Sequence, residues 1–301
     1  MSSTPSRINS QTPFSTDLGL KGSHALVTGG CGLIGKVVAH ALLAAECCVS
    51  IVDITDDCPF DRQDANICFV KADITNAEQM DQAFAKAEQR FGPVEICVAL
   101  ASLDLSVLQQ SESLADMDPK TWQRVFDVNA NGTFMTCQRW LRSIRTAAWD
   151  PQKASRLRNV SLIIVGSESG RFGVRTMAAY AAGKSAVQQG LLRSLAEDAP
   201  RLYSAARVNA VAPGPVATER FEEERRRYGD EFYYRECQAT VPPAKPIPPE
   251  DVAMTILFLA SQRYSGSVHG QLIPIDAGKT GNLVWTKEEL AERPKPGDGV
   301  N

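Results

Sequence analysis

The sequence predicts an α/β protein in which a single domain is built on a doubly wound parallel sheet with helices on both faces. Short apolar runs alternate with longer segments of helical spacing, as is typical of parallel strands joined by right-handed crossovers. The chain has 301 residues, of which 44% are hydrophobic and 22% are charged, and such a chain can bury one large core. No internal repeat interrupts the alternation.

The first half of the chain contains four expected strands. The first is a short apolar run that ends in a cluster of glycines, and the fourth is almost entirely apolar, as expected where both faces of a strand are covered. The helix before the fourth strand has Met80 and Phe84 at helical spacing and is ended by Gly92-Pro93. In chain order we expect a strand at His24–Thr28, a helix at Lys36–Ala45, strands at Cys48–Ile54 and Ile67–Ala72, a helix at Ala77–Phe91 and a strand at Val94–Ala101.

The second half of the chain continues the alternation with longer helices. A long helical segment is expected to end near Pro200, because proline cannot continue the hydrogen-bond pattern of a helix interior. In chain order we expect one or two helices over Pro119–Ser143, a strand at Val160–Gly166, a helix at Met177–Ala199, a strand at Ala206–Val211, a helix at Asp251–Ala260 and a last strand at Gln271–Ile275.

Both ends of the chain are polar and contain proline or glycine. We therefore expect flexible tails at 1–16 and 287–301 around one domain over 17–286, which includes a substrate flap at about 218–249. The N-terminal segment lacks the apolar core of a signal peptide, and no apolar run approaches the roughly 20 residues that span a bilayer. These features predict a soluble, cytoplasmic protein that does not bind membranes.

Charge and cysteine usage exclude several classes of function. The formal net charge of −3 gives no general reason to expect nucleic acid or an anionic membrane as a partner. The basic run Arg225-Arg226-Arg227 directly follows Glu222-Glu223-Glu224, which predicts a solvated helix. The eight cysteines include no Cys-x-x-Cys pair and the chain has three histidines, so we expect no metal site.

A glycine-rich turn, Thr28-Gly29-Gly30-Cys31-Gly32-Leu33-Ile34-Gly35, connects the first strand to the first helix. Glycines let the backbone approach a pyrophosphate closely, and the start of the helix offers free N–H groups and the positive end of its dipole. A turn of this kind between a strand and a helix is the context that dinucleotide binding requires, and it predicts a Rossmann fold.

Asp53 favours NAD over NADP. It ends the second strand, where a carboxylate accepts hydrogen bonds from the ribose hydroxyls of adenosine and repels a 2′-phosphate. No Arg or Lys follows it at Ile54 or Thr55. We therefore expect NAD as the cofactor, with NADP as the runner-up.

Tyr180 and Lys184 are separated by one helical turn, so their side chains share a face of the expected helix. A free tyrosine has a pKa of about 10 and is a poor base at neutral pH. A nearby cation favours the phenolate and lowers that pKa. Together with a nucleotide site, the pair suggests hydride transfer with a tyrosine as general acid and base.

Several further segments occur in a characteristic order. They are Leu20-Lys21-Gly22, Ala72-Asp73-Ile74-Thr75, Val128-Asn129-Ala130-Asn131-Gly132, Gly166-Ser167-Glu168-Ser169-Gly170, Pro213-Gly214-Pro215-Val216-Ala217-Thr218, and Val268-His269-Gly270-Gln271 with Asp276-Ala277-Gly278. In this order the chain resembles the shorter, single-domain branch of the short-chain dehydrogenase/reductase superfamily, from about Leu20 to Gly278.

The resemblance implies four catalytic residues. Tyr180 would exchange a proton with the substrate oxygen, and Ser167 would orient that oxygen. Lys184 would hold the nicotinamide ribose and lower the pKa of Tyr180. Asn129 would hold a water that links Lys184 to solvent.

The resemblance also implies the residues that hold the cofactor. Asp73 is expected near the adenine ring, and Val216 and Thr218 near the carboxamide. The expected set is Gly29, Gly32, Leu33, Ile34, Gly35, Asp53, Asp73, Ile74, Ala101, Tyr180, Lys184, Pro213, Gly214, Val216 and Thr218.

The chain departs from the family pattern at two places. Leu33 stands where the shorter branch has a glycine, which gives the glycine turn the spacing of the extended branch. After the fourth strand, Ala99-Leu100-Ala101-Ser102 replaces Asn-Asn-Ala-Gly. The loss of both amides removes hydrogen bonds between strands, so we expect an altered cofactor affinity and an unchanged fold.

The sequence indicates the substrate less clearly than it indicates the cofactor. The flap mixes aromatic residues with charges, and these aromatic residues either line a pocket for a bulky substrate or pack a small helical flap. The basic insertion Arg145–Arg158 is expected to be a surface loop.

The leading hypothesis is an NAD(H)-dependent oxidoreductase that interconverts a secondary alcohol and a ketone. The alternatives are an NAD-dependent epimerase or dehydratase, raised by the glycine spacing, and a non-catalytic cofactor-binding protein, raised by Ala99-Leu100-Ala101-Ser102. The resemblance also implies a homotetramer or homodimer, in which the helices around 120–143 and 178–197 pair across a dimer face.

Overall fold

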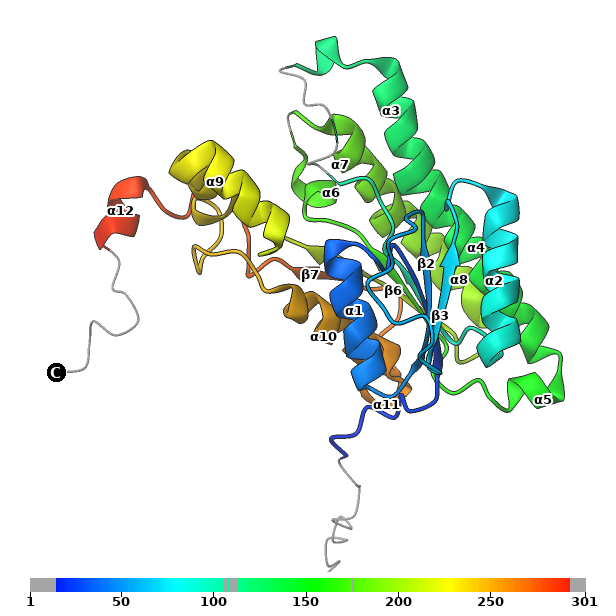
Figure 1. The fold of residues 1–301 in the computed structure, drawn as a ribbon. Helices are drawn as coiled ribbons and strands as arrows, with labels where there is room; N and C mark the ends of the chain where they lie inside the picture. Colours follow the sequence, from blue (N-terminus) through cyan, green and yellow to red (C-terminus); the bar gives the residue numbers. More distant parts are fainter. Residues whose placement is uncertain (1–14, 105–107, 109–112, 175, 293–301) are drawn as a thin grey trace, which may run out of the picture.

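Seven parallel strands form one sheet in the order β3-β2-β1-β4-β5-β6-β7 in the computed structural model (Figure 1). The structure describes residues 15–104, 108, 113–174 and 176–292. The chain winds outward in one direction from β1 and in the other from β4, so the order reverses between these two neighbours. In such sheets ligands bind at this point, beyond the carboxyl ends of the strands. The predicted doubly wound sheet is confirmed.

The strands lie where the sequence predicts them, with ends shifted by no more than two residues. β4 is shorter than expected, because Val94 and Glu95 precede the ladder and Leu100 follows it. β6 is longer and includes Pro213. The strands are β1 His24–Thr28, β2 Cys48–Asp53, β3 Ile67–Lys71, β4 Ile96–Ala99, β5 Ser161–Val165, β6 Arg207–Pro213 and β7 Leu272–Ile275.

Two of the expected long helices contain a π-helical turn. The segment expected over Pro119–Ser143 is divided into α3, the π turn η3 and α4, and the segment with Tyr180 into α7, the π turn η4 and α8. The first half of the chain contains α1 Leu33–Ala44, α2 Ala77–Phe91, the 3₁₀ turn η2 Leu114–Asp116, α3 Pro119–Phe126, η3 Asp127–Gly132 and α4 Thr133–Ala148. The second half contains α5 Pro151–Ala154, α6 Ser169–Phe172, α7 Ala178–Ser185, η4 Ala186–Leu191, α8 Leu192–Leu202, α9 Glu219–Tyr233, η5 Tyr234–Gln238, α10 Pro249–Ala260, α11 Gln262–Ser265 and α12 Lys287–Glu292.

Three differences from the sequence expectations have local causes. α1 begins earlier, because Gly32 caps it with extended backbone. The insertion Arg145–Arg158 is not only a loop: Asp150 caps α5 by accepting hydrogen bonds from the N–H groups of Gln152 and Lys153. α8 continues past Pro200, which lies in its last turn. Of the expected tails, residues 1–14 and 293–301 lie outside the described residues, whereas α12 lies within the expected C-terminal tail.

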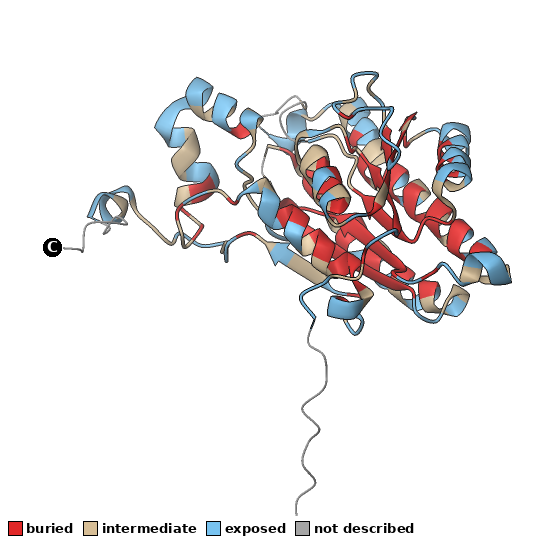
Figure 2. Cartoon of the chain, turned by 60° about the horizontal axis from the view of Figure 1, so that its bottom comes forward, coloured by how far each residue is buried: buried red, intermediate tan, exposed pale blue. Residues whose placement is uncertain are grey.

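Two apolar layers cover the two faces of the sheet. Along β5, Leu162 and Ile164 face the layer formed with α2, α4 and α8, whereas Ile163 and Val165 face the layer formed with α1 and α10. Figure 2 shows the sheet and the inward sides of these helices as buried, whereas α9 and α12 are mostly exposed. In Figure 1, α9 and α12 extend to one side of the sheet. No helix in the described part of the chain has the length and hydropathy to cross a membrane.

Candidate active site

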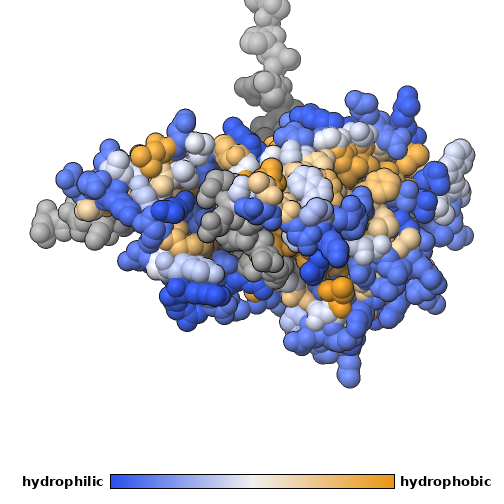
Figure 3. Space-filling view, turned by 90° about the horizontal axis from the view of Figure 1, so that it is seen from above, coloured by the Kyte–Doolittle hydropathy of each residue, from blue (hydrophilic) through white to orange (hydrophobic). Residues whose placement is uncertain are grey.

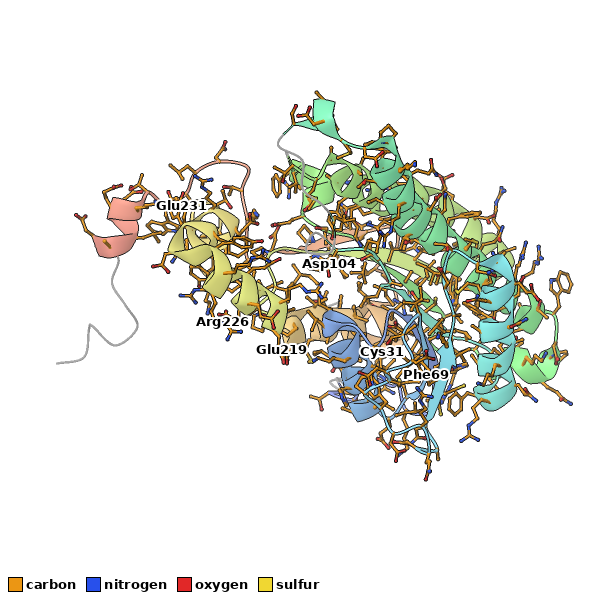
Figure 4. All side chains as sticks on the ribbon, turned by 45° about the horizontal axis from the view of Figure 1, so that its top comes forward. Cys31, Phe69, Asp104, Glu219, Arg226 and Glu231 are labelled. Carbon is orange, nitrogen blue, oxygen red and sulfur yellow. The ribbon has the colours of Figure 1, made fainter. Side chains whose placement is uncertain are left out.

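A cavity of about 1150 Å³ lies at the carboxyl ends of the strands. It extends from the glycine turn and the end of β2 to α7, the loop after β6 and α9. In Figure 4, Cys31 lies beside the start of α1, and Asp104 lies apart from it on the side that faces α9. Figure 3 shows a mainly hydrophilic face with smaller apolar areas between the charged side chains. Of the sequence-predicted site residues, all except Gly35 and Asn129 line the cavity.

The glycine turn is packed so tightly that a side chain is excluded at Gly29 and Gly35. A Cβ on Gly35 would lie 2.0 Å from the carbonyl oxygen of Gly29. Gly29 itself has φ +71°, and a Cβ there would lie 2.7 Å from Cα of Ala101. The turn thus brings the start of α1 against the ends of β1 and β4. Leu33, which stands where the shorter branch has a glycine, is the first residue of α1.

Asp53 lies across the glycine turn from α1. Its Oδ2 accepts a hydrogen bond from the N–H of Cys31 at 2.9 Å, and its Oδ1 accepts one from the N–H of Thr55 at 3.2 Å. These bonds hold the carboxylate in the cavity wall and leave each oxygen with a second lone pair for a ligand hydroxyl.

Asp73 and Ile74 lie in the wall after β3. Oδ1 of Asp73 accepts hydrogen bonds from the N–H and the hydroxyl of Thr75, each at 2.8 Å, and this turn holds the carboxylate in place. Ile74 is buried against η3, where a Cβ on Gly132 would lie 2.6 Å from its Cδ1. A side chain at position 132 would therefore have to displace Ile74.

The segment Ala99-Leu100-Ala101-Ser102, which departs from the family pattern, is bound to β1 by a hydroxyl group instead of side-chain amides. Oγ1 of Thr28 lies 3.2 Å from the N–H of Leu100 and 3.4 Å from the N–H of Ala101, and it donates to the carbonyl of Val98. This hydroxyl supplies contacts between the strands where the two family amides are missing.

Tyr180 and Lys184 are both buried on α7, and the Nζ of Lys184 lies 5.7 Å from the centroid of the tyrosine ring. Burial raises the pKa of Tyr180 to about 12, and a side-chain hydrogen bond with Ser167 opposes the shift. Burial also lowers the pKa of Lys184 to about 8. The Nζ of Lys184 donates to the carbonyl of Val165 at 2.9 Å. The structure therefore does not show the expected lowering of the tyrosine pKa, because burial outweighs the hydrogen bond with Ser167, and the charges of Asp104 and Glu168 add to the rise.

Gln188 is a site residue that the sequence interpretation missed. It is fully buried in η4, and its Oε1 accepts a hydrogen bond from the N–H of Ser167 at 2.8 Å. Gly166 and Gly170 make room for it, since a Cβ on either would lie within 2.5 Å of its amide. Its spacing was the available signal: it follows Tyr180 and Lys184 by one further helical turn on the same face.

Asn129 lies in the π turn η3 and uses its side chain for the backbone of Leu103. Its Oδ1 accepts from the N–H of Leu103 at 2.7 Å, and its Nδ2 donates to the Leu103 carbonyl at 3.0 Å. Asn129 therefore fixes the segment after β4, and its side-chain amide keeps a second hydrogen and a second lone pair for another partner.

Charged side chains surround the end of the cavity near α9. Arg220 pairs with Asp104 at 2.7 Å, and Lys279 pairs with Glu168 at 2.6 Å. Burial raises the pKa of Glu168 to about 7, although Lys279 acts against the shift.

The flap aromatic residues mainly pack on one another. Phe221 is buried, with ring centroids 5.7 Å from Phe232 and 6.1 Å from Tyr233, whereas Tyr228 is exposed. Of these side chains, Phe221 and Phe232 also line the cavity. The structure thus favours a packed helical flap with two aromatic residues at the cavity wall.

The comparisons with known proteins agree with this arrangement. The family model for short chain dehydrogenase matches residues 23–229. The 3-oxoacyl-[acyl-carrier-protein] reductase MabA of Mycobacterium tuberculosis is 31% identical over 253 residues, which cover 84% of this chain and 91% of that protein. The 2-(S)-hydroxypropyl-CoM dehydrogenase 3 of Xanthobacter autotrophicus is 30% identical, with 87% of this chain and 98% of that protein covered.

The fold also matches solved structures. A short-chain type dehydrogenase/reductase from Mycobacterium marinum aligns with a TM-score of 0.74 and 25% identity, over 88% of this chain and 98% of that one. The structure agrees with these matches. It has the same kind of parallel sheet, a tight glycine turn after β1, and the buried residues Ser167, Tyr180 and Lys184 in one cavity. The chain therefore belongs to the short chain dehydrogenase family of oxidoreductases.

Proposed function

We propose that the protein is an NAD(H)-dependent oxidoreductase that interconverts a secondary alcohol and a ketone, with Tyr180 as the general acid and base. The observation that carries this proposal is that Ser167, Tyr180 and Lys184 are buried in the wall of one cavity that also contains the glycine turn and Asp53. A bound nicotinamide dinucleotide would supply the hydride acceptor for oxidation and the donor for reduction.

The glycine turn fits a dinucleotide. Since Gly29 and Gly35 leave no room for side chains, the backbone itself forms this part of the wall. The N–H groups of the first helical turn, including those of Leu33 and Ile34, have no partner within the helix and would hold the pyrophosphate. Asp53 would accept the adenosine ribose hydroxyls, which supports the preference for NAD.

Tyr180 would handle the proton of the substrate oxygen. Since its pKa is about 12, the phenol is protonated at neutral pH and can donate to a ketone oxygen during reduction. During oxidation it must accept a proton, and Lys184 one turn away would stabilise the phenolate. Ser167, held by Gln188, would orient the reacting oxygen beside the phenol.

A substrate screen tests this proposal. Purified protein is incubated with a panel of secondary alcohols and ketones, with NAD and NADP in parallel, and the absorbance of reduced nicotinamide is followed. The expected result is turnover by the wild type and a loss of about 10²- to 10⁴-fold in kcat/KM for Tyr180→Phe. Binding of reduced nicotinamide, measured by fluorescence, should be retained in that variant, so that the loss lies in the chemical step. Full turnover by Tyr180→Phe would contradict the mechanism.

The same screen separates the alternatives. An epimerase or dehydratase would convert its substrate without net change in nicotinamide absorbance, and product analysis would reveal this. A non-catalytic protein would bind the cofactor and convert no panel member. The buried Ser167, Tyr180 and Lys184 support the oxidoreductase.

We also propose that the protein is a homotetramer or homodimer. Phe134 on α4 and Trp122 on α3 have exposed fractions of 47% and 37%, so apolar side chains reach the surface on the helices expected at a subunit interface. Light scattering after size-exclusion chromatography measures the mass directly, and a monomeric mass would contradict this proposal.

A further inference from the structure

A partly buried ion pair lies beside Ser167, and the proposed hydride transfer does not use it. Glu168 follows Ser167 directly, and its Oε1 is 2.6 Å from the Nζ of Lys279. The two side chains have exposed fractions of 13% and 15%, and both residues line the cavity. A partly buried ion pair contributes little net stability, because the loss of hydration offsets the attraction of the charges. Its place in the cavity wall instead leaves the pair within reach of a bound ligand.

Two hydrogen-bonding atoms of this wall have no partner. In the described part of the chain, three buried side-chain atoms lack a hydrogen bond: Oε2 of Glu168, Oγ1 of Thr240 and Nε2 of Gln188. The first two belong to residues that line the cavity. The backbone of Thr240 lies beside the segment of Lys279, because its carbonyl accepts the N–H of Thr280, the residue after Lys279, at 3.0 Å. Unpaired buried polar atoms are costly, so their presence in a cavity wall marks a place for a ligand group.

The charges of this wall select a neutral polar group. A carboxylate on the ligand would compete with Glu168 for Lys279 and would be repelled by Asp276 and Glu236, whose charges also raise the pKa of Glu168. An ammonium group would be repelled by Lys279 at 2.6 Å from the same carboxylate. A hydroxyl can donate to Glu168 and accept from Lys279, so it satisfies both without disturbing the pair.

We propose that Glu168, Thr240 and Lys279 form a polar subsite that receives a hydroxyl group of the substrate next to the reacting carbon. The substrate class is then a vicinal diol or the corresponding hydroxyketone, and not a simple hydrocarbon alcohol. This inference rests on the proposed function, since Glu168 is adjacent in sequence to Ser167, which would orient the reacting oxygen.

The test compares matched alcohols with and without a neighbouring hydroxyl. The probes are trans-cyclohexane-1,2-diol against cyclohexanol, and butane-2,3-diol against butan-2-ol, each at saturating NAD. The expected result for the wild type is a kcat/KM about 10- to 100-fold higher for the diol in at least one pair, as is usual when a site hydrogen-bonds a substrate group.

Three variants assign the preference to the subsite. Glu168→Gln keeps the shape of the side chain and removes the charge, Lys279→Met removes the cation, and Thr240→Val removes one hydroxyl. Glu168→Gln and Lys279→Met should reduce the diol preference by about 10-fold or more, mainly because kcat/KM for the diol falls. Thr240→Val should reduce the preference by less. Glu224→Gln is the matched control, because Glu224 lines the same cavity on α9 outside the subsite, and it should leave the preference unchanged.

The outcomes distinguish this inference from the proposed function. The subsite is overturned if the wild type has the same kcat/KM for each simple alcohol and its diol. It is also overturned if the wild type oxidises none of the four probes. An unchanged preference in Glu168→Gln and Thr240→Val also overturns it, and the thermal unfolding midpoint of each variant shows that it is folded. If the broad panel gives no redox turnover with either cofactor, the proposed function fails as well. Turnover of other alcohols without a diol preference removes the subsite alone.

Discussion

The ammonium of Lys184 lies 5.7 Å from the centroid of the Tyr180 ring, one helical turn away, and donates to the carbonyl of Val165 at 2.9 Å. Burial is the main cause of both pKa shifts, to about 8 for the lysine and about 12 for the tyrosine. Burial therefore opposes both charges that the proposed mechanism uses. A site of this kind is expected to reduce the stability of the fold.

Lys184→Met should stabilise the protein at pH 7. The pKa of Lys184 is lowered from 10.5 to about 8, so the folded state disfavours the charged form. This cost is complete below pH 8 and decreases as the pH rises to 10.5, where the unfolded lysine also loses its proton. The variant should gain up to about 3 kcal/mol in the free energy of unfolding at pH 7 and less at pH 9.5, as measured by urea denaturation. Its turnover should be lost.

Tyr180→Phe is the matched control for this measurement. The pKa of Tyr180 is raised above its ordinary value of 10. Below pH 10 the phenol is therefore protonated in both the native and the unfolded state, and its ionisation does not affect stability. The difference in the free energy of unfolding between Tyr180→Phe and the wild type should therefore vary little between pH 7 and pH 9.5. If Lys184→Met is less stable than the wild type at pH 7, the hydrogen bond to Val165 outweighs the burial of the charge, and this reasoning is wrong.

Gln188→Leu should lower kcat without preventing cofactor binding. The side chain holds the backbone N–H of Ser167, and small displacements of a positioned group can cost about 10²-fold in rate. We expect a decrease of about 10- to 100-fold in kcat with little change in the affinity for reduced nicotinamide. Gln189→Leu, on the neighbouring exposed residue, is the control and should retain wild-type kcat. Equal losses in the two variants would rule out a specific role for Gln188.

Gly35→Ala should damage the nucleotide end of the cavity. The added Cβ would lie 2.0 Å from the carbonyl oxygen of Gly29, so the glycine turn must move away from α1. We expect a loss of about 1–3 kcal/mol in stability and a weaker affinity for the dinucleotide, measured by calorimetry. Gly190→Ala in η4 is the control, since a Cβ there meets no atom within 4 Å. That change should be neutral or stabilise by up to about 1 kcal/mol.

The sequence predicts the sheet well because the strands are buried on both faces. Each strand reads as a short apolar run, and such runs are interrupted by glycine, proline or polar residues at their ends. The π turns are not visible in the sequence, because the apolar spacing of Trp140 and Ile144 on α4 continues the helix pattern beyond η3. Such turns depend on tertiary contacts such as the one between Asn129 and Leu103.

The candidate site could be predicted where a residue follows a strand or shares a helix face. Asp53 and Ser167 follow β2 and β5, and parallel topology brings such ends to one edge of the sheet. The pair of Glu168 with Lys279 could not be predicted, because its two members are far apart in sequence and meet only through the fold. The pKa direction of Tyr180 was also wrong, because a sequence does not show how deeply a phenol is buried.

Asp53→Asn should shift the cofactor preference toward NADP. The amide keeps an oxygen for the N–H of Cys31 but loses the negative charge that would face a 2′-phosphate. Like charges in contact are strongly unfavourable, so the ratio of kcat/KM for NAD to that for NADP should fall by about 10-fold or more. Asp57→Asn is the control, since Asp57 lines the same end of the cavity and should change the ratio little. If the wild type prefers NADP, or if the two variants shift the ratio equally, Asp53 does not determine the preference. The comparison is best made at low ionic strength, because salt screens the effect of exposed charges on cofactor binding.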